Sequence, residues 1–447
     1  MTDVVLAYER PSRLVADTSG LRVLDLGHTA VPAGGAEPFF DGWVAQPRLV
    51  AGLLLAVAAV ARSRYFRPIS ARSLDPILTS GDGRLRLESF SSCCGVYARA
   101  DLLPEALRDV RVESGTTNVD LNREVRDALA RLDDRDEMRL SIGSTGLRVT
   151  TRAAEAFERK VALPVRWLKG LGEAALAQVG MRPYTRLASA GTRRLLADLP
   201  AAGPSSAPPY AAVRHGREVR FHQQATADVP SVAGPFRLRE LRPLAPYAQA
   251  LTVWTRPGAG PRASGWQLDL PGARMWLVLS PDVSRGYSGE GQALDALSDP
   301  STVEEADALR PLLDWSARLD EAALARGTGV DVARVRDLLA VLGSQGLVGR
   351  DAAEDAWFRR DLPFAAARIG TLQPRVRRAG QIAASDIHSA RVEGGHEVFV
   401  RSGRIEHRVL LVGDEARCTC LWYSRHRGSR GPCRHELAAR RHVAEQA

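Results

Sequence analysis

The sequence predicts a multidomain α+β protein that ends in a small metal-binding module. Hydrophobic patterns typical of helices and of strands both occur along its 447 residues, without a repeat of fixed period. Pro-, Gly- and Ser-rich stretches interrupt these patterns, most clearly at 201–210. Three cysteines and a histidine near the carboxyl end have the spacing of metal ligands. A chain of this length allows about three domains of roughly 150 residues each.

The composition is that of a globular protein. Hydrophobic residues make up 45 % and charged residues 25 % of the chain, which excludes a largely disordered or fibrous protein. The longest apolar run, 49–60, is shorter than the roughly 20 residues that cross a bilayer and indicates a buried helix. The first residues lack the basic and apolar segments of a secretory signal. We therefore expect a cytoplasmic protein without a membrane partner.

Residues 1–200 are predicted to form an N-terminal α+β domain. Short apolar runs predict strands at 21–26 and at 84–90, the second with period-two alternation. Helical periodicity predicts helices over Pro47–Arg62 and Asn122–Leu132. These patterns describe a hydrophobic core and indicate no chemistry.

Residues 201–235 are predicted to be a linker, because clustered Pro, Gly and Ser support neither helix nor strand. The following region, 236–300, is predicted to be a small β-rich segment. Apolar and aromatic runs separated by Pro-Gly turns place antiparallel strands at 250–254, 265–270 and 275–280.

Residues 301–370 have the order of elements of a winged helix. Two helices and a hairpin are predicted around 312–326, 332–342, 347–350 and 356–359. The second helix carries two acidic and two basic side chains: Asp331, Arg334, Arg336 and Asp337. It therefore has no net positive charge, which favours a structural or protein-contacting role over direct reading of DNA.

Residues 371–447 are predicted to form the C-terminal module. The whole chain has 61 basic and 52 acidic residues, a net charge of +9. The last 47 residues hold ten arginines and five acidic residues, so they carry more than half of this excess. An anionic partner would meet this concentration of charge.

The four candidate ligands are Cys418, Cys420, Cys433 and His435, in the pattern C-x-C-x12-C-x-H. On an extended backbone Cys418 and Cys420 point to the same side, and Cys433 precedes a helix whose start favours a thiolate. Three sulfurs and one imidazole make a closed tetrahedral site, so we expect one structural Zn²⁺ with no position left for a substrate. His426 is an alternative fourth ligand, whereas His442 is about 10.5 Å along the helix from His435, too far to share an ion.

This pattern resembles the SWIM zinc finger, in which two strands carry C-x-C and a helix opens with C-x-H, a ββα arrangement. Further segments resemble bacterial proteins that contain SWIM fingers: Phe40–Trp43, Glu88–Tyr97, Gly115–Asp120, Arg285–Gly291 and Ala356–Phe364. The resemblance implies zinc binding together with contact to nucleic acid or to protein. It also implies an association with MoxR-type AAA+ ATPases and von Willebrand A-domain proteins.

The residues expected to contact nucleic acid or a protein partner are one aromatic residue and six arginines: Trp422, Arg425, Arg427, Arg430, Arg434, Arg440 and Arg441. Arginines bind phosphates while an aromatic face stacks a base, as in proteins that bind single strands. The alternative is a solvated loop in which Trp422 packs over the metal site. The sequence does not distinguish DNA, RNA and protein as partners, and it does not give the oligomeric state.

An enzymatic function is the distant alternative. Cys93 and Cys94 could serve as a nucleophile or redox pair, but adjacent cysteines before a glycine are more often small buried residues at a tight turn. No segment has the glycine-lysine pattern of a nucleotide-hydrolysing loop. The leading hypothesis is a non-enzymatic zinc protein with a basic C-terminal surface, and the alternative is an adaptor subunit of an ATPase system.

Overall fold

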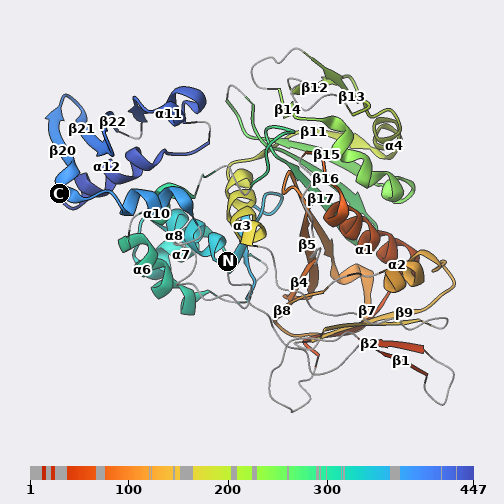
Figure 1. Cartoon of the computed structure of the whole chain (residues 1–447). Helices are drawn as coiled ribbons and strands as arrows, with labels where there is room; N and C mark the ends of the chain where they lie inside the picture. The colour runs from red at the N-terminus through yellow and green to blue at the C-terminus, as the bar shows by residue number, and fades with distance from the viewer. Residues whose placement is uncertain are drawn as a thin grey trace.

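A computed structural model gives the structure of most of the chain. It describes residues 13–16, 22–25, 38–66, 76–119, 121, 123–143, 146–151, 165–202, 209–223, 229–258, 261–287, 291, 293–298, 300–313, 315, 318–362, 373–413, 415–428 and 430–446. Within these residues the strands form five antiparallel sheets (Figure 1). No helix among them is long and apolar enough to span a bilayer.

The largest sheet has eight strands in the order β11-β15-β16-β17-β6-β5-β4-β8. These strands are β4 (Ile77–Gly81), β5 (Arg84–Phe90), β6 (Val96–Leu102), β8 (Gly115–Asn118), β11 (Arg182–Ala188), β15 (Ala250–Thr255), β16 (Ser264–Leu270) and β17 (Ala273–Leu279). At its centre β6 pairs with β17, with Ala98 opposite Leu277. Strands that are more than 150 residues apart in the sequence therefore meet in the middle of one sheet.

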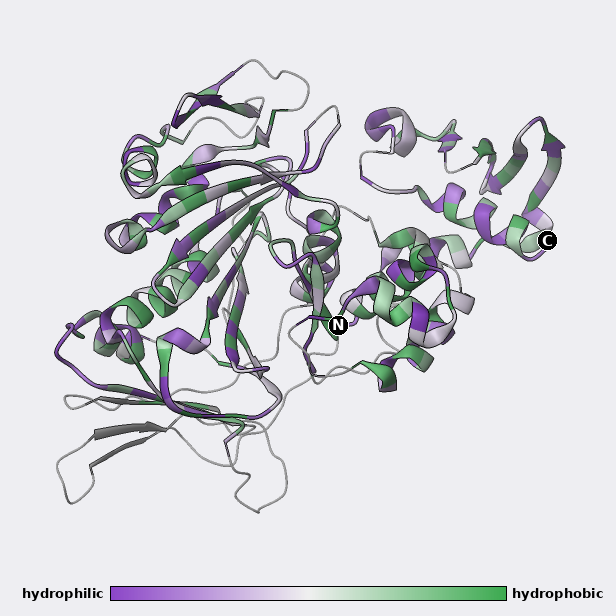
Figure 2. Ribbon diagram, turned by 180° about the vertical axis from the view of Figure 1, so that it is seen from behind, coloured by the Kyte–Doolittle hydropathy of each residue, from purple (hydrophilic) through white to green (hydrophobic). Residues whose placement is uncertain are grey.

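Helices cover both faces of this sheet. Helix α1 (Pro47–Arg62) packs on the face that carries Leu87 and Leu277. Helix α3 (Val165–Gln178) packs on the opposite face against aromatic side chains such as Phe90 and Trp276. Because both faces are covered, β6 is buried along its whole length. Hydrophobic residues concentrate on the sheet and on the adjoining helices (Figure 2).

Two smaller sheets flank the large one. A six-stranded sheet has the order β1-β2-β10-β9-β3-β7, and a three-stranded sheet has the order β13-β12-β14. Their strands are β1 (Arg13–Ala16), β2 (Arg22–Asp25), β3 (Phe40–Val44), β7 (Leu107–Val112), β9 (Met138–Gly143), β10 (Gly146–Thr151), β12 (Tyr210–His215), β13 (Glu218–His222) and β14 (Ser231–Val232). The helices around them are η1 (Pro104–Ala106), α2 (Arg123–Ala130), α4 (Ser189–Ala197) and η2 (Pro235–Tyr247).

The arrangement differs from the sequence-based division in two ways. Strands from 1–200 and from 236–300 form one sheet, because hydrophobic patterns give the strands but not their pairing partners. The expected linker, 201–235, contributes the three strands of the smallest flanking sheet. The individual strands and α1 lie close to where the patterns place them.

A helical unit follows, with α5 (Leu294–Ser298), α6 (Pro300–Leu309), η4 (Arg310–Leu312), α7 (Glu321–Thr328), α8 (Val332–Ser344), β18 (Val348–Asp351) and β19 (Ala356–Arg359). The order helix, turn, helix, hairpin is present. The first of these helices begins later than expected because the Asp320 carboxylate caps it, accepting a hydrogen bond from the Ala323 amide at 2.6 Å. Gly172 of α3 allows close packing on α8, since a Cβ there would lie 2.9 Å from the Ser344 backbone.

A buried network of charges joins the β18–β19 hairpin to the large sheet. We call it the arginine junction: Arg86, Arg99, Arg274, Asp101, Asp351 and Glu354. Asp351 Oδ2 lies 2.9 Å from Arg99 Nη2 and 3.1 Å from Arg274 Nη2. Asp101 Oδ2 lies 3.0 Å from Arg99 Nη2. Because buried charges are tolerated only when paired, these residues fix the hairpin in one position on the sheet.

The C-terminal module consists of a four-stranded sheet, β20-β21-β22-β23, covered by a helix. Its elements are α10 (Pro374–Gly380), η6 (Ala384–Asp386), β20 (Ile387–Val392), β21 (Gly395–Ser402), β22 (Ile405–Val412), β23 (Glu415–Cys418), α11 (Leu421–His426) and α12 (Arg434–Ala444). Strands β21 and β22 form a hairpin, and α12 packs on it through Leu437 and Val409. The module is larger than the expected ββα unit, because it also contains α10 and β20. These two elements come from a stretch without strong apolar periodicity, so no local pattern predicts them.

Candidate metal centre

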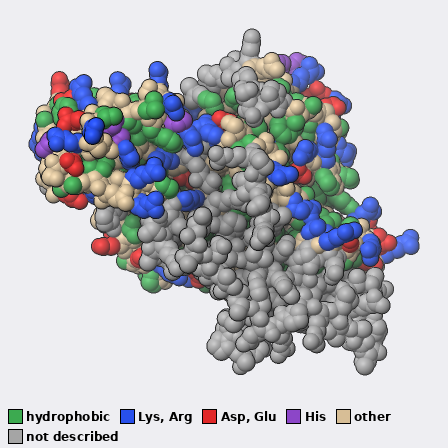
Figure 3. Space-filling view, viewed as in Figure 1, with side chains coloured by type: hydrophobic (Ala, Val, Ile, Leu, Met, Phe, Trp, Pro, Cys, Tyr) green, Lys and Arg blue, Asp and Glu red, His purple; other side chains and the backbone are tan. Residues whose placement is uncertain are grey.

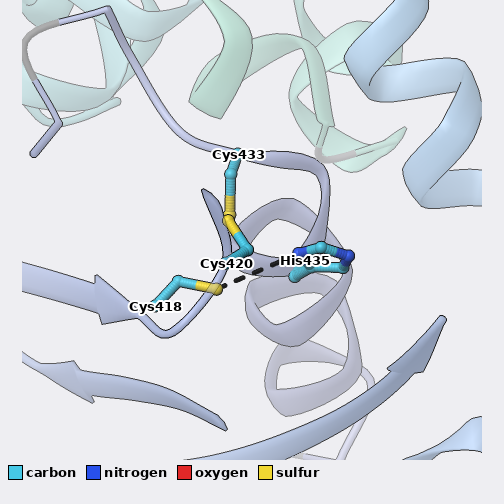
Figure 4. Close-up of side chains that lie close together, drawn as sticks. All are labelled: Cys418, Cys420, Cys433 and His435. Atoms are coloured by element: carbon cyan, nitrogen blue, oxygen red, sulfur yellow. Dashed lines mark hydrogen bonds between the residues drawn. The ribbon is translucent and has the colours of Figure 1, made fainter. Parts of the chain in front are cut away.

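Local chain geometry brings the four candidate ligands to one point. Cys418 ends β23, Cys420 is the N-cap of α11, and Cys433 is the N-cap of α12. His435 lies in the first turn of α12. All four side chains are buried and point toward one another (Figure 4).

The distances fit a single ion. The ligand atoms of Cys418, Cys420, Cys433 and His435 all lie within 4.8 Å of one another. Ligands at about 2.0–2.3 Å from one tetrahedral ion are about 3.5–4 Å apart, so small side-chain rotations complete the site. The donor set is buried and closed, and it could hold a metal ion.

Two of the cysteines also cap helices. The Tyr423 amide donates to Cys420 Sγ at 3.4 Å, and the Glu436 amide donates to Cys433 Sγ at 3.3 Å. Hydrogen bonds from the other two thiols lower the pKa of Cys420, and hydrogen bonding within the same cluster raises the pKa of Cys433. Three neighbouring thiolates repel one another, so a cation is needed to hold all three in the deprotonated state.

His435 faces the cysteines through Nδ1, which lies 3.9 Å from Cys418 Sγ. Its Nε2 accepts a hydrogen bond from Arg434 Nε at 3.1 Å, and its ring stacks on His407 with centroids 4.0 Å apart. A histidine that binds a metal through Nδ1 carries its proton on Nε2. Metal binding therefore requires that Arg434 give up this hydrogen bond. Arg434 keeps a second acceptor, Ser402 Oγ, 2.9 Å from its Nη2.

The alternative histidines lie elsewhere in the module. His426 packs its ring against Trp422 at a centroid distance of 4.4 Å. His442 lies on α12, with Nε2 2.9 Å from Gln446 Nε2. Neither belongs to the group of described residues that could hold an ion.

A cavity of about 530 Å³ opens beside the candidate centre. We call it the basic cavity, after five of its lining residues: Lys169, Arg375, Arg378, Arg430 and Arg434. Trp422, Cys420, Cys433 and His435 also line it. Figure 3 shows basic side chains gathered on the C-terminal module, including its side toward the rest of the chain.

The structure divides the arginines that the sequence analysis grouped together. Arg430 and Arg434 line the basic cavity, whereas Arg425 and Arg427 are exposed at the end of α11 and in the next turn. On α12, Arg440 pairs with Glu436 at 3.3 Å and Arg441 pairs with Glu445 at 3.7 Å.

Sequence reasoning missed four residues around the centre. Lys169, Arg375 and Arg378 line the cavity, and His407 stacks on the candidate ligand. Lys169 is one of only two lysines in the chain, and Arg375 belongs to a Pro-Arg-Val-Arg-Arg run. These signals were visible, but nothing in the sequence connects α3 with α10.

The cysteine pair lies in the core. Cys93 and Cys94 are both buried, and Cys94 has a positive φ of 55°. Its carbonyl accepts a hydrogen bond from the Tyr287 amide at 2.8 Å.

Residues from three segments that the sequence analysis singled out meet where the β18–β19 hairpin packs on the large sheet. Tyr97 donates to Glu88 at 2.6 Å, and Arg360 forms a buried ion pair with the same carboxylate. The Asp361 amide donates to Thr116 Oγ1 at 3.0 Å. These segments therefore position the hairpin on the large sheet.

Comparisons with known proteins leave the family open. No protein-family model matches the chain, and no curated protein matches it. Among solved structures, proliferating cellular nuclear antigen from Entamoeba histolytica is similar at a TM-score of 0.35 and 10 % identity, covering 54 % of this chain and 98 % of that chain. The PCNA2–PCNA3 complex from Sulfolobus tokodaii gives a TM-score of 0.35 and 8 % identity, covering 55 % and 100 %. At these TM-scores the similarity supports no conclusion.

The fold and the site together define a class of protein: a chain of mixed α and β structure with several sheets and a C-terminal Cys₃His group that could bind a metal.

Proposed function

We propose that the chain is a non-enzymatic zinc protein whose C-terminal module is a SWIM-type finger that contacts nucleic acid. The observation that carries the proposal is the buried group of three thiols and one imidazole within 4.8 Å of one another. Sulfur and nitrogen ligands in a closed tetrahedral set are typical of structural zinc. Such a site stabilises a fold and offers no open position for catalysis.

The nucleic-acid contact is assigned to Arg425, Arg427 and Arg430, beside the candidate centre. Base stacking on Trp422 is a weaker part of this interface, because the Arg375 and Arg430 guanidinium carbons lie 4.7 Å and 5.2 Å from its ring centroid. Phosphate contacts by arginine therefore account for the expected binding.

Elemental analysis tests the zinc site. We expect about one zinc per chain in the purified wild type, and a loss of that zinc in Cys433→Ser. Cys93→Ser is the matched control, since it removes a thiol outside the cluster and leaves the zinc content unchanged. A metal-free wild type, or zinc retained in Cys433→Ser, contradicts the proposal.

Salt dependence tests the nucleic-acid contact. The affinity for a labelled strand of about 20 nucleotides is expected to fall steeply with salt, with a slope reduced by about 0.7 for each phosphate that the protein no longer neutralises. The triple change Arg425→Gln, Arg427→Gln and Arg430→Gln is expected to flatten this slope. Binding that ignores both salt and these changes rejects a nucleic-acid function.

An adaptor function in an ATPase system is the second candidate, and the ion pairs formed by the arginines of α8 support it. Arg334 pairs with Glu305 at 2.8 Å and Arg336 pairs with Glu321 at 2.7 Å, so both basic residues of the helix are engaged inside the unit. This favours protein contact over DNA reading by the winged-helix-like segment. Reproducible co-purification of an AAA+ ATPase or a von Willebrand A-domain protein supports the adaptor, and purification with nucleic acid alone contradicts it.

A further inference from the structure

The basic cavity is built from parts of the chain that are far apart in sequence. Lys169 comes from α3, Arg375 and Arg378 come from α10, and Arg430 and Arg434 flank Cys433. Its volume of about 530 Å³ lies within the usual range for small-ligand sites, about 300–1,000 Å³.

The described residues that line the cavity include five basic side chains and no aspartate or glutamate. Burial, and then the charge of nearby Arg377, lower the pKa of Lys169. Like charges repel, so a concave site of this kind attracts anions and gains from their binding.

Neutral groups orient two of the arginines. Arg375 Nη1 donates to the carbonyls of Arg430 at 2.6 Å and Pro432 at 2.8 Å. Arg434 Nη2 donates to Ser402 Oγ at 2.9 Å. The Ser402 hydroxyl fixes the Arg434 guanidinium without cancelling its charge. The cavity is therefore preorganised for an anion, which lowers the entropy lost on binding.

The arrangement also indicates which anion fits. Arginine binds phosphate oxygens through two parallel N–H groups, and lysine adds a point charge. The Trp422 ring already has two guanidinium groups close to it, so stacking of a base on this ring is a weaker contact than phosphate binding. Lys169, Arg378 and Arg434 around one cavity match a ligand with several negative charges better than a single carboxylate.

We infer that the basic cavity binds the phosphate groups of a multiply charged anion, with Lys169, Arg378 and Arg434 as its main contacts. The shared chemistry is an accessible terminal phosphate or a run of adjacent phosphates. It is supplied either by a free polyphosphate or nucleoside polyphosphate, or by the phosphorylated end of a nucleic-acid strand. The inference goes beyond the proposed function, because a free phosphate ligand requires no strand.

Titration of the full-length, metal-loaded protein with inorganic tripolyphosphate tests this site. The double change Lys169→Gln and Arg378→Gln is expected to weaken binding about tenfold or more. The control is Arg391→Gln with Arg404→Gln, which removes two exposed charges from the same module outside the cavity and should change affinity less than about threefold. Arg378→Gln alone serves if the double variant does not fold.

A second arm identifies the source of the phosphate. Two strands of one sequence are compared, one with a 5′-phosphate and one with a 5′-hydroxyl. A preference for the phosphorylated strand that disappears in the cavity variant assigns the site to strand ends, and equal affinities together with tight tripolyphosphate binding assign it to free polyphosphates.

The inference is overturned if tripolyphosphate does not bind, or if its affinity falls equally in the cavity variant and in the control. Salt-dependent binding of the 5′-hydroxyl strand in that case leaves the proposed nucleic-acid function standing. Conversely, loss of strand binding with retained tripolyphosphate binding rejects the proposed function and keeps the cavity.

Discussion

Two arginine-rich regions of this chain differ in the groups that surround their positive charges. In the arginine junction, Arg86, Arg99 and Arg274 face Asp101 and Asp351 inside the protein. In the basic cavity, the described lining holds five basic residues and no acidic one. The residue type is the same, but the junction is closed by carboxylates and the cavity is open to a ligand.

The difference shows why net charge alone does not locate a binding site. In the junction, carboxylates beside the buried guanidinium groups offset their charge, so these arginines add little to the external field. At the wall of the basic cavity, the neutral Ser402 hydroxyl accepts a hydrogen bond from the Arg434 guanidinium and leaves its charge available. The groups that face the arginines among the described residues, rather than arginine content, mark the surface that an anion can use.

The largest expected effect separates the two regions by their dependence on metal. Chelation, or the change Cys433→Ser, is expected to unfold the C-terminal module, because structural zinc contributes about 10 kcal/mol or more to folding. Hydrogen exchange should rise in β20–β23 and α12 and stay unchanged in β5, β6 and β17. Equal loss of protection in both regions would show that they fold as one unit and would remove the contrast.

A smaller but still large effect is expected from the change Asp351→Asn. It leaves Arg99, Arg86 and Arg274 short of one buried carboxylate, which destabilises by about 3–5 kcal/mol. Urea unfolding measures the loss. The matched control, Asp134→Asn, removes an exposed carboxylate 3.9 Å from Arg48 and should change stability by less than about 0.5 kcal/mol. A loss of similar size in both variants would contradict the assigned role of the junction.

The pH dependence of stability sharpens this result. Burial alone would raise the pKa of Asp351, but the charges of Arg99, Arg86 and Arg274 outweigh it and hold that pKa well below its usual range. A carboxyl group with a lowered folded-state pKa stabilises fully above its unfolded-state pKa of about 3.9, and the contribution is lost as pH falls toward the folded-state pKa.

The stability difference between the wild type and Asp351→Asn should therefore be constant near neutral pH and shrink below about pH 4. Urea midpoints measured across that range check it. A difference that shrinks instead as the pH rises above neutral would assign the effect to another group.

The smallest effect is expected on α8. Arg334→Gln and Arg336→Gln each remove a partly exposed ion pair and should change stability by about 1 kcal/mol or less, with strand affinity unaltered. Fluorescence anisotropy with the labelled strand measures the second quantity. A marked loss of strand binding would show that internally paired arginines also bind nucleic acid, which breaks the comparison.

Local features of this protein could be predicted, whereas long-range ones could not. Helix α1 has the predicted bounds, and the spacing of Cys418, Cys420, Cys433 and His435 gives the group that the structure brings together. Both depend on residues that are close in sequence. The pairing of β6 with β17 and the approach of Lys169 to Arg378 depend on tertiary packing, which no local pattern encodes.

The strand β5 shows a subtler limit. Its alternation is typical of a strand with one face in water, yet Arg86 and Glu88 are both buried. Their partners, Asp351 and Arg360, lie more than 250 residues further along the chain. A polar face on a strand can thus meet either solvent or the polar face of another unit, and one sequence does not distinguish them.

The candidate metal centre and the basic cavity share a wall, since Cys420, Cys433 and His435 belong to both. If the ion changes the affinity for an anion by some factor, thermodynamic reciprocity requires the anion to change the affinity for the ion by the same factor. Where that factor exceeds one, the C-terminal module holds its metal most tightly while the anion is bound.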